Sequence, residues 1–265
     1  TIIDYFSKSS CQKVLQLYGN PDLVTATNVF AHIDYPSNVL DQVSSLLKEE
    51  GVFVIEVHYL KSLIELNQYD TIYHEHMRYY SLTSLNNLLS TKGFSIFHAK
   101  LIPSHGGSIR VYSSRSLNYK DKGTYSKLLS QELDFFKSEI NLSSYQACVE
   151  SQRHELLAIL IKIKSEGKKI IAIGAPSRGT TLLNYCGINS SIISYICEIT
   201  GSHKIGYRMP GTGIPVVDES VLFEEQPDFA LLLSWHIQKE LIANLRRKGL
   251  KSKFIIPLPK PMIID

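Results

Sequence analysis

The sequence predicts an α/β protein with two Rossmann-like units and a helical segment between them. Apolar runs of strand length alternate with amphipathic helical patterns over residues 22–57 and again over residues 170–256. This order is typical of sheets that carry helices on their faces. We therefore expect a first unit over residues 1–117, a helical linker over 118–166 and a second Rossmann-like unit over 167–265.

In the first unit, apolar residues at helical spacing mark helices, and short β-type runs mark strands. The expected helices cover residues 10–18, 34–48 and 81–89, and the expected strands cover 1–6, 22–27, 52–57, 95–102 and 108–113. The run at 22–27 has the composition of a buried strand. The alternation of strand and helix predicts a parallel, doubly wound sheet.

The second half of the chain shows the same alternation after a long helical region. Expected helices cover about 125–164, 180–185 and 239–248, and expected strands cover 170–174, 192–196, 215–217, 229–234 and 254–256. Together these predict a compact Rossmann-like domain of about one hundred residues.

Composition and charge exclude several classes of protein. The chain is 44% hydrophobic, and its net charge of +3 comes from dispersed Lys and Arg that form no basic face for nucleic acid. No apolar run reaches the roughly 20 residues of a membrane-spanning helix, so no membrane partner is expected. The four cysteines form no C-x-x-C pair. Their spacing argues against a zinc knuckle or a disulfide framework and favours a reducing, cytoplasmic setting.

The run Tyr73-His74-Glu75-His76 is the first candidate site. It follows a strand and a helix, and ligands of open α/β sheets bind beyond the carboxyl ends of the strands. A histidine can accept a proton near neutral pH, and a neighbouring carboxylate can orient it. Proton-transfer chemistry is therefore the leading interpretation, and a structural polar loop is the alternative. The H-x-H spacing has no identifiable third ligand, so we expect no metal here.

A second candidate is His105-Gly106-Gly107-Ser108 with Arg110. The two glycines would let backbone approach a ligand closely, and Arg110 could bind a carboxylate or phosphate. A tight turn between two strands explains the same glycines. Asn28 and His32, at the end of an expected strand, could face a cofactor, or Asn28 could be a cap.

The segment 174–181, Gly-Ala-Pro-Ser-Arg-Gly-Thr-Thr, follows an apolar strand and opens a helix, where free N–H groups favour an anion such as phosphate. Its spacing matches neither the dinucleotide motif nor the P-loop. Glu198 stands where a carboxylate often binds ribose, although a solvated strand end is the alternative. His203, Lys204, Tyr207 and Arg208 add positive and aromatic groups. Together they indicate a nucleotide diphosphate.

These motifs resemble, in order and over nearly the whole chain, the S-adenosylmethionine-dependent sugar C-methyltransferases, including those that act on nucleotide-linked 4-keto-6-deoxy sugars. The matching segments are Thr27–His32, Tyr73–His76, His105–Tyr112, Gly174–Tyr185, Pro210–Thr212 and Ile214–Val216. The resemblance implies part of a class I methyltransferase sheet followed by a nucleotide-sugar domain, and methyl transfer to a carbon beside a ketone.

The resemblance also implies roles for individual residues. His76 would be the general base, while Tyr73 and Glu75 would position the base or the sugar and polarise the carbonyl. Asn28, Val29 and His32 would border S-adenosylmethionine. From the motifs and the resemblance together, the residues expected to bind the nucleotide-diphosphate sugar are His105, Gly106, Arg110, Ala175, Ser177, Arg178, Thr180, Asn184, Glu198, Lys204 and Arg208.

The chain departs from the family pattern before the strand at 22–27. The glycine-rich loop and acidic ribose-binding residue of a class I methyltransferase are not found there, nor are the cysteines of the family's zinc segment. We expect that an N-terminal portion carries the donor loop and the zinc. That portion was cut away, is supplied by another chain or lies outside these 265 residues. A non-catalytic nucleotide-sugar-binding module without a donor site and an oxidoreductase are the competing functions.

Overall fold

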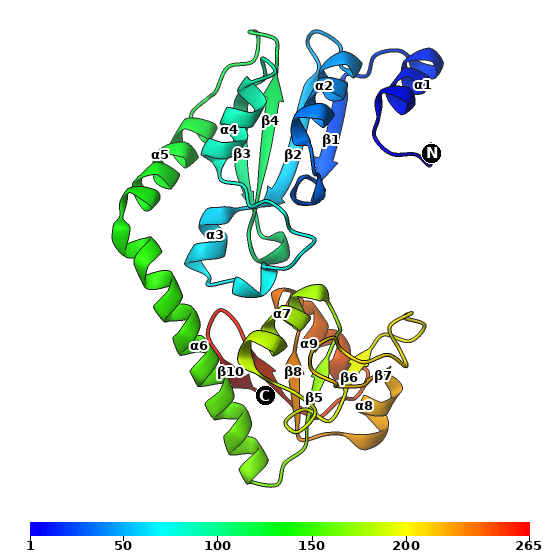
Figure 1. The fold of residues 1–265 in the computed structure, drawn as a ribbon, viewed down its shortest axis with the longest axis vertical. Coiled ribbons are helices and arrows are strands. Elements are labelled where there is room, and N and C mark those ends of the chain that lie inside the picture. Colours follow the sequence, from blue (N-terminus) through cyan, green and yellow to red (C-terminus); the bar gives the residue numbers. More distant parts are fainter. The chain divides into compact units, whose positions relative to one another are not determined.

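The computed structural model describes the backbone of residues 1–265 and all side chains except those of residues 139–141. Its contacts divide the chain into two compact units, one formed by residues 1–65 and 74–141, the other by residues 66–73 and 142–265 (Figure 1). The helical segment expected over 118–166 is thus shared between the units. The short segment 66–73 belongs to the second unit although its neighbours on both sides belong to the first.

The first unit contains a four-stranded sheet of order β1-β2-β4-β3. Its strands are β1 (Leu23–Thr27), β2 (Val52–His58), β3 (Ser95–Ile102) and β4 (Ser108–Ser114). β1 and β2 are parallel, whereas β4 is antiparallel to both β2 and β3. The prediction of a parallel, doubly wound sheet is therefore wrong for this unit, whose sheet is mixed. The connection between β3 and β4 is too short for the crossover that parallel neighbours require.

Helices cover this sheet and close its core. They are α1 (Lys8–Tyr18), α2 (Pro36–Leu46), α3 (Leu60–Glu65), α4 (Leu82–Ser90) and α5 (Thr124–Lys137). Ser81 begins α4 with a capping box, its hydroxyl accepting a hydrogen bond from the backbone N–H of Ser84. Fully buried side chains from strands and helices form one core, among them Phe30, Phe53, Leu82, Leu85, Phe94 and Ile109.

Two predictions at the start of the chain are wrong. Residues 1–6 form no strand, and Ile3 and Tyr5 are almost fully exposed. β1 is not a buried strand, because its residues alternate between exposed and half-buried. In the described sheet β1 is an edge strand paired with β2, so only one face of it is covered.

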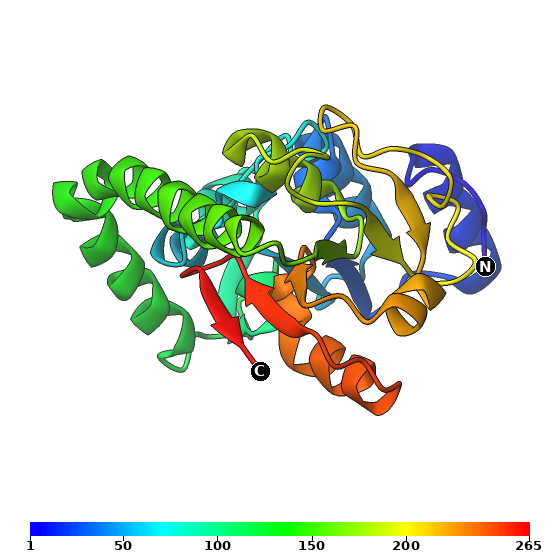
Figure 2. The ribbon, with the colours of Figure 1, turned by 90° about the horizontal axis from the view of Figure 1, so that it is seen from below.

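The second unit contains a six-stranded sheet of order β10-β9-β8-β5-β6-β7. Its strands are β5 (Ile170–Ile173), β6 (Ile196–Glu198), β7 (Val216–Asp218), β8 (Phe229–Leu232), β9 (Lys253–Ile256) and β10 (Met262–Ile264). All neighbours are parallel except β9 and β10, and Figure 2 shows this antiparallel pair with the C-terminus at the end of β10. The prediction of a Rossmann-like domain is therefore confirmed for this unit.

The helices of the second unit are α6 (Glu139–Ser165), α7 (Ser177–Cys186), α8 (Ser220–Glu225) and α9 (Gln238–Arg247). The sequence did not predict α8 or β10. The strand expected at 192–196 lies at 196–198 instead, because Ile192 and Ile193 donate backbone hydrogen bonds to Asn189 O in a turn. None of the helices described in the structure is long and apolar enough to cross a bilayer.

A buried ion pair holds the segment 66–73 in the second unit. Asp70 is fully buried and accepts hydrogen bonds from Arg178 Nε at 2.8 Å and Nη2 at 3.0 Å. Trp235 Nε1 donates to the same carboxylate at 2.7 Å, and the Arg178 guanidinium lies 4.8 Å from the centre of the Trp235 ring. The pair therefore has the additional hydrogen bonds that a buried charge needs.

Candidate active site

The segment that carries His76 is fixed to the end of β1 by two hydrogen bonds. The backbone N–H of Met77 donates to Ala31 O at 3.0 Å, and His32 Nδ1 lies 2.8 Å from Glu75 O. His32 follows β1 in a single 3-10 turn, Phe30–His32. These contacts place His76 beyond the carboxyl end of β1, where ligands of open α/β sheets bind.

Four imidazoles from four different segments form a row in the first unit. The ring centre of His76 lies 4.9 Å from that of His32 and 5.5 Å from that of His58, and His58 lies 5.5 Å from His105. His58 is the last residue of β2. The row therefore spans the carboxyl ends of the two parallel strands.

This row brings together three of the predicted residues and adds one that sequence reasoning missed. His32, His76 and His105 were expected site residues, whereas His58 was not, because the expected strand ended at residue 57. The sequence did carry a signal for His58, namely a polar residue one position beyond the predicted end of the strand. Imidazoles can accept and donate protons, so the row offers groups suited to proton transfer.

The other two residues expected beside the base lie differently. The side chain of Glu75 is exposed, and only its carbonyl oxygen is tied to His32. Tyr73 is half-buried and belongs to the second unit. Among the described side chains, no group of three or more His, Cys, Asp and Glu residues is arranged to hold a metal ion.

The geometry of the turn between β3 and β4 requires the glycines found there. His105, Gly106 and Gly107 all have positive φ, and a Cβ on Gly107 would lie 2.7 Å from the Cβ of Ser62. Tyr59 N donates to Gly107 O at 3.2 Å, so the turn packs on the start of α3. The structure thus supports the tight-turn interpretation of the glycines, while His105 joins the imidazole row.

Arg110 is occupied by an internal partner. Its Nε donates to Glu56 Oε2 at 2.7 Å, and Glu56 is buried in the same sheet. Ser104 Oγ donates to the other carboxylate oxygen at 3.2 Å. A ligand carboxylate or phosphate would have to compete with this ion pair, so we leave Arg110 out of the proposed site.

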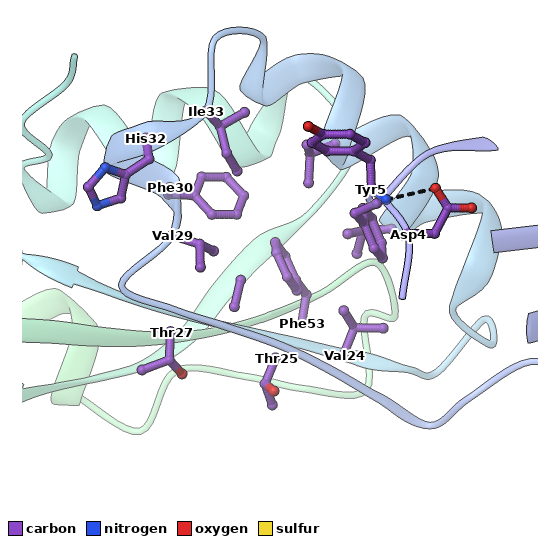
Figure 3. Close-up of a pocket in the computed structure, with 14 residues that line it drawn as sticks. Asp4, Tyr5, Val24, Thr25, Thr27, Val29, Phe30, His32, Ile33 and Phe53 are labelled. Carbon is purple, nitrogen blue, oxygen red and sulfur yellow. Dashed lines mark hydrogen bonds between the residues drawn. The ribbon is translucent and has the colours of Figure 1, made fainter. Parts of the chain in front are cut away.

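A cavity of about 630 Å³ lies along β1. Asn28 has φ +54 and turns the chain after β1, so that Val29 and His32 line the cavity while Asn28 does not. Figure 3 shows Tyr5 and Asp4 at one end of the lining, His32 at the other, and the rings of Phe30 and Phe53 between them. The walls are mostly apolar.

A second cavity, of about 500 Å³, lies in the second unit beside the N-terminus of α7. Five predicted substrate-binding residues line it, namely Ala175, Ser177, Thr180, Lys204 and Arg208, together with His203 and Tyr207. Lys204 Nζ donates to Ala175 O at 2.7 Å and Arg208 Nη1 donates to Gly213 O at 2.6 Å. The cavity therefore combines cations, hydroxyl groups and a helix N-terminus, which suits phosphate.

Three further residues expected to bind substrate do not line this cavity. Arg178 is the buried partner of Asp70, which removes it from the proposed site. Asn184 Nδ2 donates to Thr180 O at 2.8 Å and to Pro210 O at 3.0 Å, so it ties α7 to the loop between β6 and β7. Glu198 accepts hydrogen bonds from the backbone N–H groups of Ala175 and Ile199 and faces a different cavity.

Comparisons with known proteins agree with this architecture. Residues 4–99 match a family model described as a methyltransferase domain, and residues 103–259 match one described as a C-methyltransferase C-terminal domain. The C-methyltransferase NovU of Streptomyces niveus is 31% identical over 269 residues, an alignment that covers this whole chain and 64% of NovU. The chain thus spans somewhat less than two thirds of that relative's length.

Solved structures resemble the chain only in part. Magnesium protoporphyrin IX methyltransferase from Synechocystis, with bound SAH, has 17% identity and a TM-score of 0.30 over 39% of this chain and 48% of its own. A precorrin-6y methyltransferase from Geobacter metallireducens has 17% identity and a TM-score of 0.28 over 44% of this chain and 53% of its own.

The match of residues 4–99 to a methyltransferase domain indicates the class of protein. Because the second model covers more than half of the 265 residues, the chain belongs to the C-methyltransferase family.

Proposed function

We propose that this chain performs S-adenosylmethionine-dependent C-methylation of a nucleotide-linked keto-deoxysugar at the carbon beside the ketone. The observation that carries the proposal is the position of His76, whose ring lies 4.9 Å from His32 and 5.5 Å from His58 beyond the parallel strands β1 and β2. The similarity to NovU, a C-methyltransferase, supports the reaction class.

In the proposed mechanism His76 removes a proton from the sugar carbon beside the carbonyl and leaves an enolate. The exposed carboxylate of Glu75 positions the sugar by accepting hydrogen bonds from its hydroxyl groups. S-adenosylmethionine, when bound, supplies an electrophilic methyl group to the carbanion carbon. The remaining role of the chain is to hold the sugar carbon in line with the methyl group and to exclude water.

The cavity along β1 fits part of the methyl donor. Val24, Ala26 and Val29 give it apolar walls that suit an adenine ring and a methyl thioether, and the carboxylate of Asp4, which pairs with Lys13 at 3.5 Å, lies in the lining. We infer that Val29 and His32 border the donor, and that Asn28 contributes through its backbone turn rather than its side chain.

The cavity beside α7 fits the diphosphate of the substrate. Lys204, His203 and Arg208 supply positive charge or donors, and Ser177 and Thr180 supply hydroxyl groups. Guanidinium and ammonium groups bind phosphate oxygens with charge-assisted hydrogen bonds. We infer that this cavity binds the diphosphate of the nucleotide-linked sugar.

The test is replacement of the proposed base. His76→Asn should lower the rate of methyl transfer about 10²–10⁴-fold, because general-base catalysis typically contributes that much. Exchange of the sugar α-proton with deuterated solvent should fall in parallel, since it depends on the same proton removal.

His154→Asn, an exposed histidine on α6, is the matched control and should leave both rates unchanged. Normal exchange and methylation in His76→Asn would remove His76 from the base role. Calorimetry with S-adenosylmethionine and with a nucleotide sugar separates the enzyme from a binding module, which would take up only the sugar.

A further inference from the structure

The side chain of Arg78 joins the segment that carries His76 to the chain that follows β1. Its Nη1 donates to Ile33 O at 2.6 Å, and its Nη2 donates to Asp34 O at 2.8 Å. Both acceptors are backbone carbonyl groups, and they follow one another in the chain. Arg78 therefore holds two consecutive peptide groups of a segment that lies about 45 residues earlier in the sequence.

An arginine suits this contact better than a lysine. The guanidinium is planar and presents its N–H groups in a rigid fork, so two of them can reach neighbouring acceptors at once. A lysine offers one point charge on a flexible stem. The two bonds of Arg78 therefore fix the orientation of its segment as well as its distance from the other segment.

The contact lies close to the proposed base. Arg78 follows His76 by two residues, and it binds the carbonyl groups of the two residues directly after His32. The rings of His32 and His76 lie 4.9 Å apart. Between His76 and Arg78, the backbone N–H of Met77 donates to Ala31 O at 3.0 Å. The two contacts together hold the chain after His76, and they restrict where its ring can lie.

The carbonyl groups that Arg78 binds belong to a segment that lines the cavity along β1. Ile33 lines this cavity, and so does His32 (Figure 3). One half-buried side chain thus connects the segment of the proposed base to the wall of the proposed donor cavity. Methyl transfer requires an accurate relation between base, sugar carbon and donor, and a misplacement of about 1 Å can cost about 10²-fold in rate.

We propose that Arg78 is a positioning residue, which fixes the segment of His76 against the wall of the donor cavity. It acts through the geometry of the base and not through contact with the reacting atoms. Its effect on rate rests on the proposed function, whereas the contact between the two segments can be tested without any reaction.

The kinetic test removes the donors of Arg78 and keeps the length of the side chain. Arg78→Met should lower kcat for methyl transfer about tenfold or more while KM for the sugar stays within about twofold. Arg78→Lys, which can hold one carbonyl group at a time, should give an intermediate kcat. Arg115→Met is the matched control and should leave kcat unchanged, because Arg115 is a half-buried arginine of the same unit that donates to Leu47 O at 3.4 Å. A normal kcat in Arg78→Met, or a rise in KM alone, would overturn the proposal.

The distance between two imidazole rings gives a measurement that needs no turnover. NMR of the chain with isotope-labelled histidine should show a nuclear Overhauser effect between the ring protons of His32 and His76. The effect should weaken in Arg78→Met and persist in Arg115→Met. Full persistence in Arg78→Met would overturn the role of Arg78 whether or not the chain methylates a sugar. Weakening in a chain that methylates no sugar would support the contact and overturn only the proposed function.

Discussion

At the scale of single residues, the proposed chemistry depends on the imidazole neighbours of His76. His58 is half-buried, and its ring lies 5.5 Å from those of both His76 and His105. It touches neither reacting atoms nor donor in the proposed mechanism, so it is a positioning residue. Side chains that lock a catalytic group contribute through the accuracy of its geometry.

His58→Asn should therefore lower kcat for methyl transfer about tenfold while KM for the sugar stays within about twofold, because only the position of the base changes. His98→Asn, which alters a histidine bound to Thr124 on the other part of the same sheet, should leave kcat unchanged. A rise in KM alone, with normal kcat, would contradict the positioning role.

The cysteines differ in reactivity because they differ in burial. All four described cysteines are free; Cys148 is exposed, whereas Cys11, Cys186 and Cys197 are buried. Burial raises the pKa of the Cys11 and Cys186 thiols, and it raises the pKa of Cys197 to about 12, with nearby carboxylates adding to the effect.

Since the thiolate is the reactive form, the three buried thiols should stay protonated and unreactive at pH 8. Ellman's reagent should therefore label Cys148 first in the native chain and all four cysteines after denaturation. Cys148→Ser should abolish the fast reaction. Fast labelling of Cys197 at pH 8 would contradict the predicted burial.

At the scale of elements, the buried ion pair decides where residues 66–73 belong. Asp70 accepts hydrogen bonds from Arg178 on α7 and from Trp235 after β8, so it joins three segments of the second unit. Removing one partner of such a pair leaves an uncompensated buried charge.

Asp70→Ala should therefore reduce the free energy of unfolding of the second unit by about 3–5 kcal/mol. Urea unfolding followed by the fluorescence of Trp235, the single tryptophan, measures this change. Lys168→Ala, which removes an exposed ion pair with Asp228 in the same unit, should change it by less than about 1 kcal/mol. Equal effects of both substitutions would show that the buried pair adds no stability.

The turn between β3 and β4 gives a matched test of close packing. Gly107 has φ +119 and no space for a Cβ, whereas Gly93 has φ +75 and nothing within 4 Å of the position. Gly107→Ala should cost about 2–4 kcal/mol, the sum of backbone strain and overpacking, and Gly93→Ala about 1–2 kcal/mol from strain alone. Thermal unfolding of the first unit, compared between the two variants, checks the difference.

At the scale of the whole molecule, the spacing of apolar residues and the glycines and caps at segment ends predicted most helices and strands. The long pattern of α6, the capped α4 and the apolar runs of β5 and β8 are signals that local sequence carries, because each depends on spacing within one element. The strand at 196–198 was misplaced by a local turn, and the short elements α8 and β10 were missed because few residues define them.

The candidate sites were predictable in part for the same reason. Residues next to one another in sequence, such as Ser177 and Thr180, stayed together in one cavity. Arg110 and Arg178 were expected to bind ligands, yet each has a buried carboxylate partner more than fifty residues away, Glu56 and Asp70 respectively. No local pattern reveals a partner at that distance.

The sequence by itself determined the α/β class, the order of the elements and the motifs that identify a C-methyltransferase, because propensity, period and motif spacing are properties of neighbouring residues. Only the tertiary structure decided that β4 runs antiparallel, that His58 joins the imidazole row and that Glu198 faces its own cavity. Those features depend on which strands become neighbours, and strand pairing is set by packing between distant segments of the chain.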